Sequence, residues 1–307
     1  MRFDTTARID DHRRMQITEQ EVRTGLRRGR YVTTARVETA VFVALVLEKP
    51  LLVEGPAGAG KTELAKVLAE MLSTELVRLQ CYEGLDEARA LYEWNYQKQL
   101  LRLQADRTLE AGSSWQTLSK DIFSREYLLE RPLLHAITAE RRVVLLIDEV
   151  DKSDEEFEAF LLEVLSDFQV SVPELGTIPA RHRPVVVLTS NRARELSEAL
   201  KRRCLHLYVD FPGVEKEAEI LALKVPEADE ALREQVARFV GRLRKLDLKK
   251  APSIAETLDW CRALLALGIA ALDAAAVRQT LSLLLKHEED IRKAEPKIAS
   301  ALSDSRR

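Results

Sequence analysis

Short apolar runs alternate with amphipathic stretches over the first two thirds of the chain. Apolar or alternating runs predict strands at 50–53, 75–80, 142–147 and 184–189. Apolar residues at helical spacing predict helices at 34–48, 62–72, 86–103 and 155–165. Strands that alternate with helices, several of them apolar throughout, are typical of a parallel sheet that is covered on both faces. The sequence therefore predicts an α/β fold.

The pattern changes after Phe211-Pro212-Gly213, where helical spacing continues without a further strand. Before that point, a hairpin is expected at 168–180, and a Gly-Ser break lies at 112–114. The first 30 residues are polar and rich in arginine. We therefore expect three parts: an arm or short helix at 1–30, an α/β core at 31–212 and a small all-helical domain at 213–307.

The composition is that of a globular chain with a well-solvated surface. Of 307 residues, 46% are apolar and 32% are charged, and the net charge of −3 gives no general electrostatic reason to bind nucleic acid. The chain has no apolar stretch of about 18 residues and no apolar signal-peptide core, so we expect no membrane span and a cytoplasmic location. Three scattered cysteines and five isolated histidines show no metal-binding spacing.

The segment 55–62, Gly-Pro-Ala-Gly-Ala-Gly-Lys-Thr, fits the pattern G-x-x-x-x-G-K-[ST] of phosphate-binding loops. A predicted strand precedes it and a predicted helix follows it, as that loop requires. Glycines let the backbone wrap around an anion, and the amides at the start of the helix point at phosphate oxygens. Lys61 is expected to reach the terminal phosphates, and the Thr62 hydroxyl to bind Mg²⁺. A glycine-rich turn that matches by chance is the alternative, and the flanking elements argue against it.

Two acids, Asp148 and Glu149, end the apolar strand at 142–147. Ligand sites collect at the carboxyl ends of strands in open parallel sheets. Asp148 is expected to hold Mg²⁺, directly or through water, and Glu149 to orient and activate the attacking water. Phosphoryl transfer depends mostly on positioning and charge stabilisation, so a carboxylate beside the metal is the group it needs. Without the phosphate-binding loop, a solvated strand end that caps the next helix would be the better interpretation.

Two weaker signals follow the next strand. Asn191, in Thr189-Ser190-Asn191, would be able to hold the attacking water, although asparagine at a strand end is usually a turn former. An arginine in the basic run 201–203 would be able to reach a neighbouring subunit's nucleotide, although such a run is most often a solvated face.

The order of these parts resembles the AAA+ ATPases. GPAGAGKT, LLIDEVDK, TSN and LKRRC, followed by a helical lid, carry this resemblance. Three further features resemble the MoxR branch, and within it the CoxD-like group associated with carbon monoxide dehydrogenase maturation. They are the segment PLLVEGPAGAGKTELAKVLA, the insert at about 81–131 and the hairpin FQVSVPELGTIPA. The resemblance runs from about Tyr31 to Leu267.

Carried onto this chain, the resemblance implies roles for individual residues. Asp148 would bind Mg²⁺, Glu149 would be the catalytic base and Asn191 the first sensor. Arg203 is the best match for the arginine finger, and Arg202 is the second choice. The residues implied in ATP binding are Gly55, Pro56, Ala57, Gly58, Ala59, Gly60, Lys61, Thr62 and Glu63, with Tyr31 and Val32 near the adenine.

The insert and the hairpin are the parts that the resemblance places toward a central pore or a partner. Trp94 and Tyr96 in the insert and Pro173 in the hairpin are the candidates. Ordinary packing is the alternative, since an aromatic residue at helical spacing more often belongs to a core.

The chain departs from the family at the second sensor, an arginine in a Ser-Pro-Arg-like string. The matching string here, 252–257, is Pro-Ser-Ile-Ala-Glu-Thr and has no arginine. Arg262 lies two turns further on and is the candidate to replace it.

As a function, the resemblance implies an ATP-driven remodelling machine, a hexameric ring that acts with a von Willebrand factor A domain protein on a target enzyme, with a metalloenzyme as one candidate. A nucleic-acid-stimulated motor and an ATP-gated scaffold with little turnover are the alternatives. The mixed charges of the insert argue against the motor, and intact Lys61, Asp148 and Glu149 argue against the scaffold.

Overall fold

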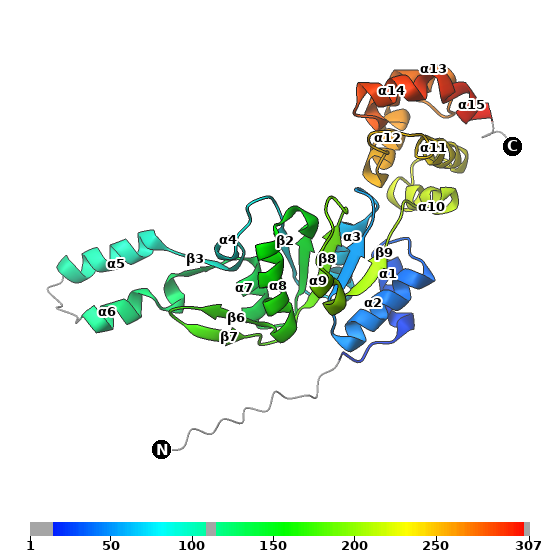
Figure 1. The fold of residues 1–307 in the computed structure, drawn as a ribbon. Helices are drawn as coiled ribbons and strands as arrows, with labels where there is room; N and C mark the ends of the chain where they lie inside the picture. The colour runs from blue at the N-terminus through cyan, green and yellow to red at the C-terminus, as the bar shows by residue number, and fades with distance from the viewer. Residues whose placement is uncertain (1–14, 109–114, 304–307) are drawn as a thin grey trace. The chain divides into compact units, whose positions relative to one another are not determined.

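The computed structural model describes residues 15–108 and 115–303, which form two compact units (Figure 1). Among the described residues, the first unit comprises those up to Gly25, Ala35–Glu54 and Leu68–Leu207. The second comprises Leu26–Thr34, Gly55–Val67 and the chain from Tyr208 onward. The Gly-Ser break predicted at 112–114 lies outside the described residues.

A five-stranded sheet runs through the first unit in the order β2-β5-β8-β1-β9. Its strands are β1 (Leu51–Glu54), β2 (Leu76–Gln80), β5 (Val144–Asp148), β8 (Val185–Ser190) and β9 (Leu205–Tyr208). β1 pairs with β8, β8 with β5 and β5 with β2, all in parallel. The predictions of an α/β fold and of four of these strands are confirmed. The sequence analysis missed β9, because Leu-His-Leu-Tyr is short and interrupted by a polar residue.

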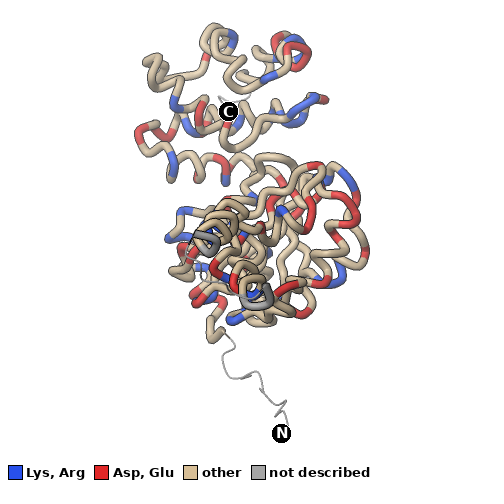
Figure 2. Tube along the Cα trace, turned by 90° about the vertical axis from the view of Figure 1, so that its left-hand side faces the viewer, with Lys and Arg blue, Asp and Glu red and all other residues tan. Residues whose placement is uncertain are grey.

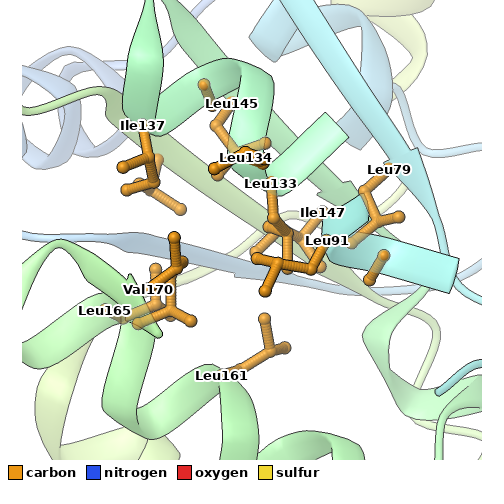
Figure 3. Close-up of a cluster of buried hydrophobic side chains, with 14 of the residues drawn as sticks. Leu79, Leu91, Leu133, Leu134, Ile137, Leu145, Ile147, Leu161, Leu165 and Val170 are labelled. Carbon is orange, nitrogen blue, oxygen red and sulfur yellow. The ribbon is translucent and has the colours of Figure 1, made fainter. Parts of the chain in front are cut away.

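The central strand β5 is buried on both faces. Leu145 and Ile147 lie in the larger hydrophobic core, among side chains from α7 (Pro132–Thr138), α8 (Glu155–Asp167) and β6 (Gln169–Val172) (Figure 3). The labelled side chains that surround them include Leu133, Leu134, Ile137, Leu161, Leu165 and Val170. Val144 and Leu146, at the alternate positions, are equally buried. This double burial accounts for the continuous apolar run in the sequence.

Three helices occupy the N-terminal part of the described chain: α1 (Glu19–Arg28), α2 (Ala35–Leu47) and α3 (Lys61–Met71). The two helices predicted at 34–48 and 62–72 are confirmed. The polar segment before residue 30 contains α1, whose Val22 and Leu26 are completely buried. This part of the segment is therefore a packed helix.

The prediction of one long helix at 86–103 is wrong. The chain there forms α4 (Glu87–Leu91), β3 (Tyr92–Trp94) and α5 (Tyr96–Thr108). β3 pairs antiparallel with β4 (Leu128–Glu130), a partner more than thirty residues away that helical periodicity does not reveal. Asn95 follows the strand directly, and its side chain accepts a hydrogen bond from the Lys98 amide at 3.0 Å.

Of the two interpretations offered for Trp94, ordinary packing is the one that the structure supports. Its side chain is buried, and its ring meets Phe123 edge to face at 5.3 Å between centroids. Tyr96, two residues on, is 64% exposed. The aromatic pattern thus combines one core residue with one surface residue.

Short elements complete the first unit. They are α6 (Trp115–Ile122), η1 (Arg125–Tyr127), η2 (Val150–Lys152), β7 (Gly176–Pro179) and α9 (Glu198–Arg203). β6 and β7 form the predicted hairpin, with Val172 opposite Gly176. The helix predicted at 155–165 is confirmed as α8. Cys81 and Cys204 are buried in the core of this unit.

Beyond residue 213, the described chain is helical, as predicted. The helices are α10 (Val214–Lys224), α11 (Glu230–Leu243), α12 (Ile254–Ala266), α13 (Ala274–Leu284), α14 (Glu288–Ala294), η3 (Glu295–Lys297) and α15 (Ile298–Ser303). They enclose a second core that contains Trp260, Phe239 and Cys261. None of the helices in the described ranges has the length and apolarity to cross a membrane.

The second core includes a buried polar contact that is open to test. Trp260 is completely buried, and its indole N–H donates to the Thr280 hydroxyl at 2.8 Å. Thr280→Val should lower the free energy of unfolding by about 1–3 kcal/mol, because the indole then has no acceptor. Thr280→Ser keeps the hydroxyl and is the matched control. Denaturant unfolding followed by tryptophan fluorescence measures both, and equal losses in the two variants would contradict the assignment.

Candidate functional site

The carboxyl ends of three adjacent strands carry most of the predicted catalytic residues. Asp148 is the last residue of β5 and Ser190 the last of β8, while Glu54 ends β1 directly before the phosphate-binding loop. In the sheet, β8 lies between β5 and β1, so the three ends lie side by side at one edge. This is the edge where open parallel sheets hold their ligands.

Asp148 is fixed by two side-chain contacts. The carboxylate is buried and accepts a hydrogen bond from the Thr189 hydroxyl at 2.6 Å. Its second oxygen accepts from Arg78 on β2, also at 2.6 Å. A carboxylate this deeply buried is costly unless it is paired and hydrogen-bonded, and these partners supply both.

Glu149 has left-handed backbone angles, with φ at 57°, and this turns the chain away from the strand. Its amide donates to the Thr189 hydroxyl at 2.8 Å. Its carboxylate accepts from the Asn191 side-chain amide at 3.0 Å and from the Gln80 side-chain amide at 3.1 Å. Lys152 lies 2.5 Å from the same carboxylate. The hydrogen bond from Lys152 to Glu149 raises the pKa of the Lys152 ammonium, which therefore stays charged.

The structure thus brings together Asp148, Glu149 and Asn191, three of the residues predicted from the sequence. The sequence analysis missed Arg78 and Gln80, although one signal was available. Both are polar residues at alternate positions of β2 and point to the same side of the strand. Only the pairing of β2 with β5, which sets Gln80 opposite Asp148, shows what that side meets.

Cys81, directly after β2, lies close to the same acids. Burial, followed by the charges of Asp148, Asp151 and Glu149, raises the pKa of its thiol to about 12. The thiol is therefore protonated near neutral pH, and we assign it no part in the chemistry.

Glu54 connects the strand ends further. It is buried, accepts a hydrogen bond from His206 at 2.8 Å and pairs with Arg192 at 3.5 Å. Arg192 follows Asn191 directly. The segment after β8 is thereby tied to the end of β1.

The phosphate-binding loop has the backbone that its glycines predict. Gly55, Gly58 and Gly60 have φ values of 152°, 78° and 90°, a region that side chains disfavour. Helix α3 begins at Lys61, whose side chain is buried and donates to the carbonyls of Gly55 and Pro56, each at 2.7 Å. The loop therefore closes around its own lysine.

Two glycines of this loop have no room for a side chain. A Cβ on Gly55 would lie 1.8 Å from the Val209 carbonyl oxygen, and one on Gly58 would lie 2.2 Å from the Ser253 Cβ. The Gly58 carbonyl also accepts a hydrogen bond from the Ile254 amide at 3.1 Å. These contacts lie within the second unit and place the start of α12 against the loop.

The string 252–257, which lacks the second-sensor arginine, forms this start of α12. Ser253 and Glu256 make a capping box there. Arg262 is exposed, with its guanidinium bonded to Asp259 at 3.1 Å and to the Lys224 carbonyl at 3.3 Å. Arg262 is thus held by its own helix and by the end of α10.

Tyr31, Val32 and Glu63 belong to the same unit as the loop. Burial, followed by the charge of Glu63, raises the pKa of Tyr31 to about 12. Glu63 itself pairs with Lys224 at 3.1 Å. Burial alone would raise the pKa of Glu63, but its contacts with Lys224 and Lys66 lower it. Its carboxylate is therefore engaged with α10.

The two finger candidates differ in their contacts. Both lie at the end of α9 and are exposed. Arg203 donates its Nε to the Ser166 hydroxyl at 2.6 Å and its Nη1 to the Ala199 carbonyl at 3.3 Å. The Arg202 side chain has no hydrogen-bond or ion-pair partner among the described residues.

Each unit has donors of the kind that a magnesium nucleotide needs. In the second unit, the loop offers backbone groups and a lysine in a cradle that a Cβ would fill. The Thr62 hydroxyl of the second unit and the Asp148 carboxylate of the first are each hard oxygen ligands, the kind that Mg²⁺ prefers. Within the described ranges, no group of three or more His, Cys, Asp or Glu residues forms a separate metal site.

Comparison with known protein families gives one match. Residues 50–204 match the model of the AAA domain, dynein-related subfamily. The match includes the phosphate-binding loop, both acids, Asn191 and the arginine pair.

Two of the similar proteins differ in how much of their length this chain covers. The chain is 33% identical over 139 residues to chaperone protein ClpB 2 of Parasynechococcus marenigrum, but it spans only 13% of that protein's length. It is 27% identical over 229 residues to Uncharacterized protein SH1500 of Staphylococcus haemolyticus, with 72% of this chain and 78% of that one covered.

Among solved structures, the RuvB Holliday junction branch migration motor of Thermotoga maritima is similar, with a TM-score of 0.47 and 17% identity. The alignment covers 89% of this chain and 72% of that one. Since the family match spans just over half of the chain and includes the strand-end acids and the loop described above, this protein belongs to the AAA domain family, dynein-related subfamily, and is an ATPase.

Proposed function

We propose that the protein uses ATP hydrolysis to remodel another protein, in the manner of the MoxR-type ATPases. The observation that carries this proposal is the arrangement around Glu149. Asn191 and Gln80 hold its carboxylate at 3.0 and 3.1 Å, beside the buried Asp148. A carboxylate oriented in this way is suited to accept a proton from an attacking water.

The proposed hydrolysis divides the work among the chain's own groups. The amides of the loop and the Lys61 ammonium bind the phosphates. Thr62 and Asp148 would hold Mg²⁺, and the ion would neutralise charge on the phosphate oxygens. Glu149 takes the proton of the attacking water, and Asn191 keeps Glu149 and the water in place. Tyr31 and Val32 would lie near the adenine.

We further propose that the active form is a ring of six subunits. Arg203, with Arg202 as the second candidate, would reach the nucleotide of the neighbouring subunit. Both side chains are exposed at the end of α9, and this exposure supports such a role. An arginine supplied in trans stabilises charge that develops on the phosphoryl group.

The MoxR type, and more narrowly the CoxD-like group, is proposed on the insert and the hairpin. The insert places α5 and α6 beyond the small sheet of β3 and β4 (Figure 1). It leaves Tyr96, Leu100 and Leu101 of α5 exposed, at 64%, 58% and 66%. A von Willebrand factor A domain protein is the proposed partner and an enzyme the proposed target, with metalloenzymes as the first candidates. Stimulation of ATP hydrolysis by such a partner encoded beside this protein would test this assignment.

A nucleic-acid-stimulated motor is the weaker alternative. Lys and Arg are interspersed with Asp and Glu along the trace (Figure 2). In the insert, Lys98 and Arg102 are paired with Glu126 and Asp121. DNA that raises ATP turnover, with an effect that weakens steeply as salt increases, would favour the motor.

The variant Glu149→Gln tests the assignment of Glu149 as the general base. We expect the rate of phosphate release to fall by about 100-fold or more, because the amide cannot accept the proton. ATP binding should persist, since the phosphate-binding loop is unchanged. Glu155→Gln, at an exposed position on α8, is the matched control. Unchanged turnover in Glu149→Gln would refute the assignment of the base, whereas Lys61→Met should lose ATP binding itself.

The finger and the ring are tested together by mixing two inactive proteins. Arg203→Ala should lower turnover by about 1,000-fold or more without loss of ATP binding. Mixed with Glu149→Gln protein, it should regain activity, because about one interface in four then joins an intact base to an intact finger. Arg202→Ala is the comparison. A mixture as inactive as its components would exclude action across an interface.

A further inference from the structure

The segment 191–197, here termed the connecting loop, joins Asn191 to the N-terminus of α9. It therefore links the residue that touches Glu149 to the helix that carries Arg202 and Arg203. Loops of this kind normally lie on the surface and are mobile. This one is held at both ends by buried carboxylates from the segment that follows the catalytic acids.

Asp151, in η2, holds the first end. It is 3% exposed, and its Oδ2 accepts the amides of Asn191 at 3.1 Å and Ala193 at 2.8 Å. Its Oδ1 is buried without a hydrogen-bond partner among the described residues. The side chain is thus committed to the backbone on either side of Arg192.

Glu158, in α8, holds the second end. It is 1% exposed, and its Oε2 accepts the Ser197 amide at 3.0 Å, while Oε1 forms an ion pair with Arg194. Arg194 also donates to the Ser153 carbonyl at 2.7 Å. Ser197 in turn caps α9, its hydroxyl accepting the Leu200 amide at 3.3 Å.

Burying two carboxylates in one small region costs free energy of folding. A buried charge lowers stability unless partners compensate it, and apolar side chains of similar volume are often as stable or better. The partners here are three backbone amides at defined positions of the connecting loop, together with the Arg194 side chain of the same loop. What these carboxylates supply, and apolar residues would not, is a defined position for each amide.

We infer that Asp151 and Glu158 are positioning residues for ATP hydrolysis. Asp151 fixes the position of the Asn191 backbone, so that the Asn191 side chain reaches Glu149. Glu158 sets the start of α9, and with it the direction of Arg202 and Arg203. The inference rests on the proposed roles of Glu149, Asn191 and the arginines.

The first test uses the full chain with Asp151→Ala and Asp151→Asn. Asp151→Ala should lower kcat by about 100-fold, the scale of a small misplacement in an active site. The dissociation constant for ATP should change less than about twofold, since the phosphate-binding loop is not involved. Asp151→Asn keeps an oxygen for the two amides and should retain most of kcat. Glu155→Gln again serves as the control for removal of one acid.

A double-mutant cycle separates positioning from general destabilisation. If Asp151 acts through Asn191, then Asp151→Ala combined with Asn191→Ala should be no slower than Asn191→Ala alone. By the same reasoning, Glu158→Ala should cost nothing further once Arg203, or whichever arginine proves to be the finger, is alanine. Multiplicative losses in both cycles would overturn the inference, as would equal kcat values for Asp151→Ala and Asp151→Asn.

The outcomes also distinguish this inference from the proposed function. If Asn191→Ala lowers kcat but Asp151→Ala does not, the inference fails and the proposed function stands. If Asn191→Ala has wild-type kcat, the role assigned to Asn191 fails, and the inference fails with it.

Discussion

One hydroxyl group organises the two acids at the end of β5. Thr189 donates to the Asp148 carboxylate at 2.6 Å and accepts the Glu149 amide at 2.8 Å. The first contact fixes the predicted metal ligand. The second supports the left-handed turn at Glu149, a conformation that is unfavourable for a residue with a side chain. Because Thr189 lies on the adjacent strand, the geometry of both acids depends on the parallel pairing of β5 with β8.

The phosphate-binding loop and the two strand-end acids belong to different compact units. The phosphate-binding loop belongs to the unit that contains the helical part, and Gly58 touches Ser253 and Ile254 directly. A change in the loop backbone therefore acts on α12 without an intervening side chain. This contact offers a physical route for coupling where the second-sensor arginine is missing.

The features that were predicted correctly from the sequence have a local pattern. The loop at 55–62 and the acidic pair each follow an apolar run, and both runs form strands, β1 and β5. The failure at 86–103 has a physical cause, because β3 exists only through its pairing with β4. Arg78 and Gln80 were missed for the same reason, because the sequence of a strand does not show which strand it pairs with. Tertiary pairing, not local propensity, determined each of these positions.

The burial of the three cysteines has a practical consequence for anyone who labels this protein. Cys81 and Cys204 lie in one core and Cys261 in the other, and burial is the main cause that raises the pKa of each thiol. Maleimides react with the thiolate, so we expect these three cysteines to react slowly with maleimides while the chain is folded. A single cysteine introduced on the exposed face of α5 or α9 would then carry a fluorophore without background, and subunit contacts would become visible by energy transfer.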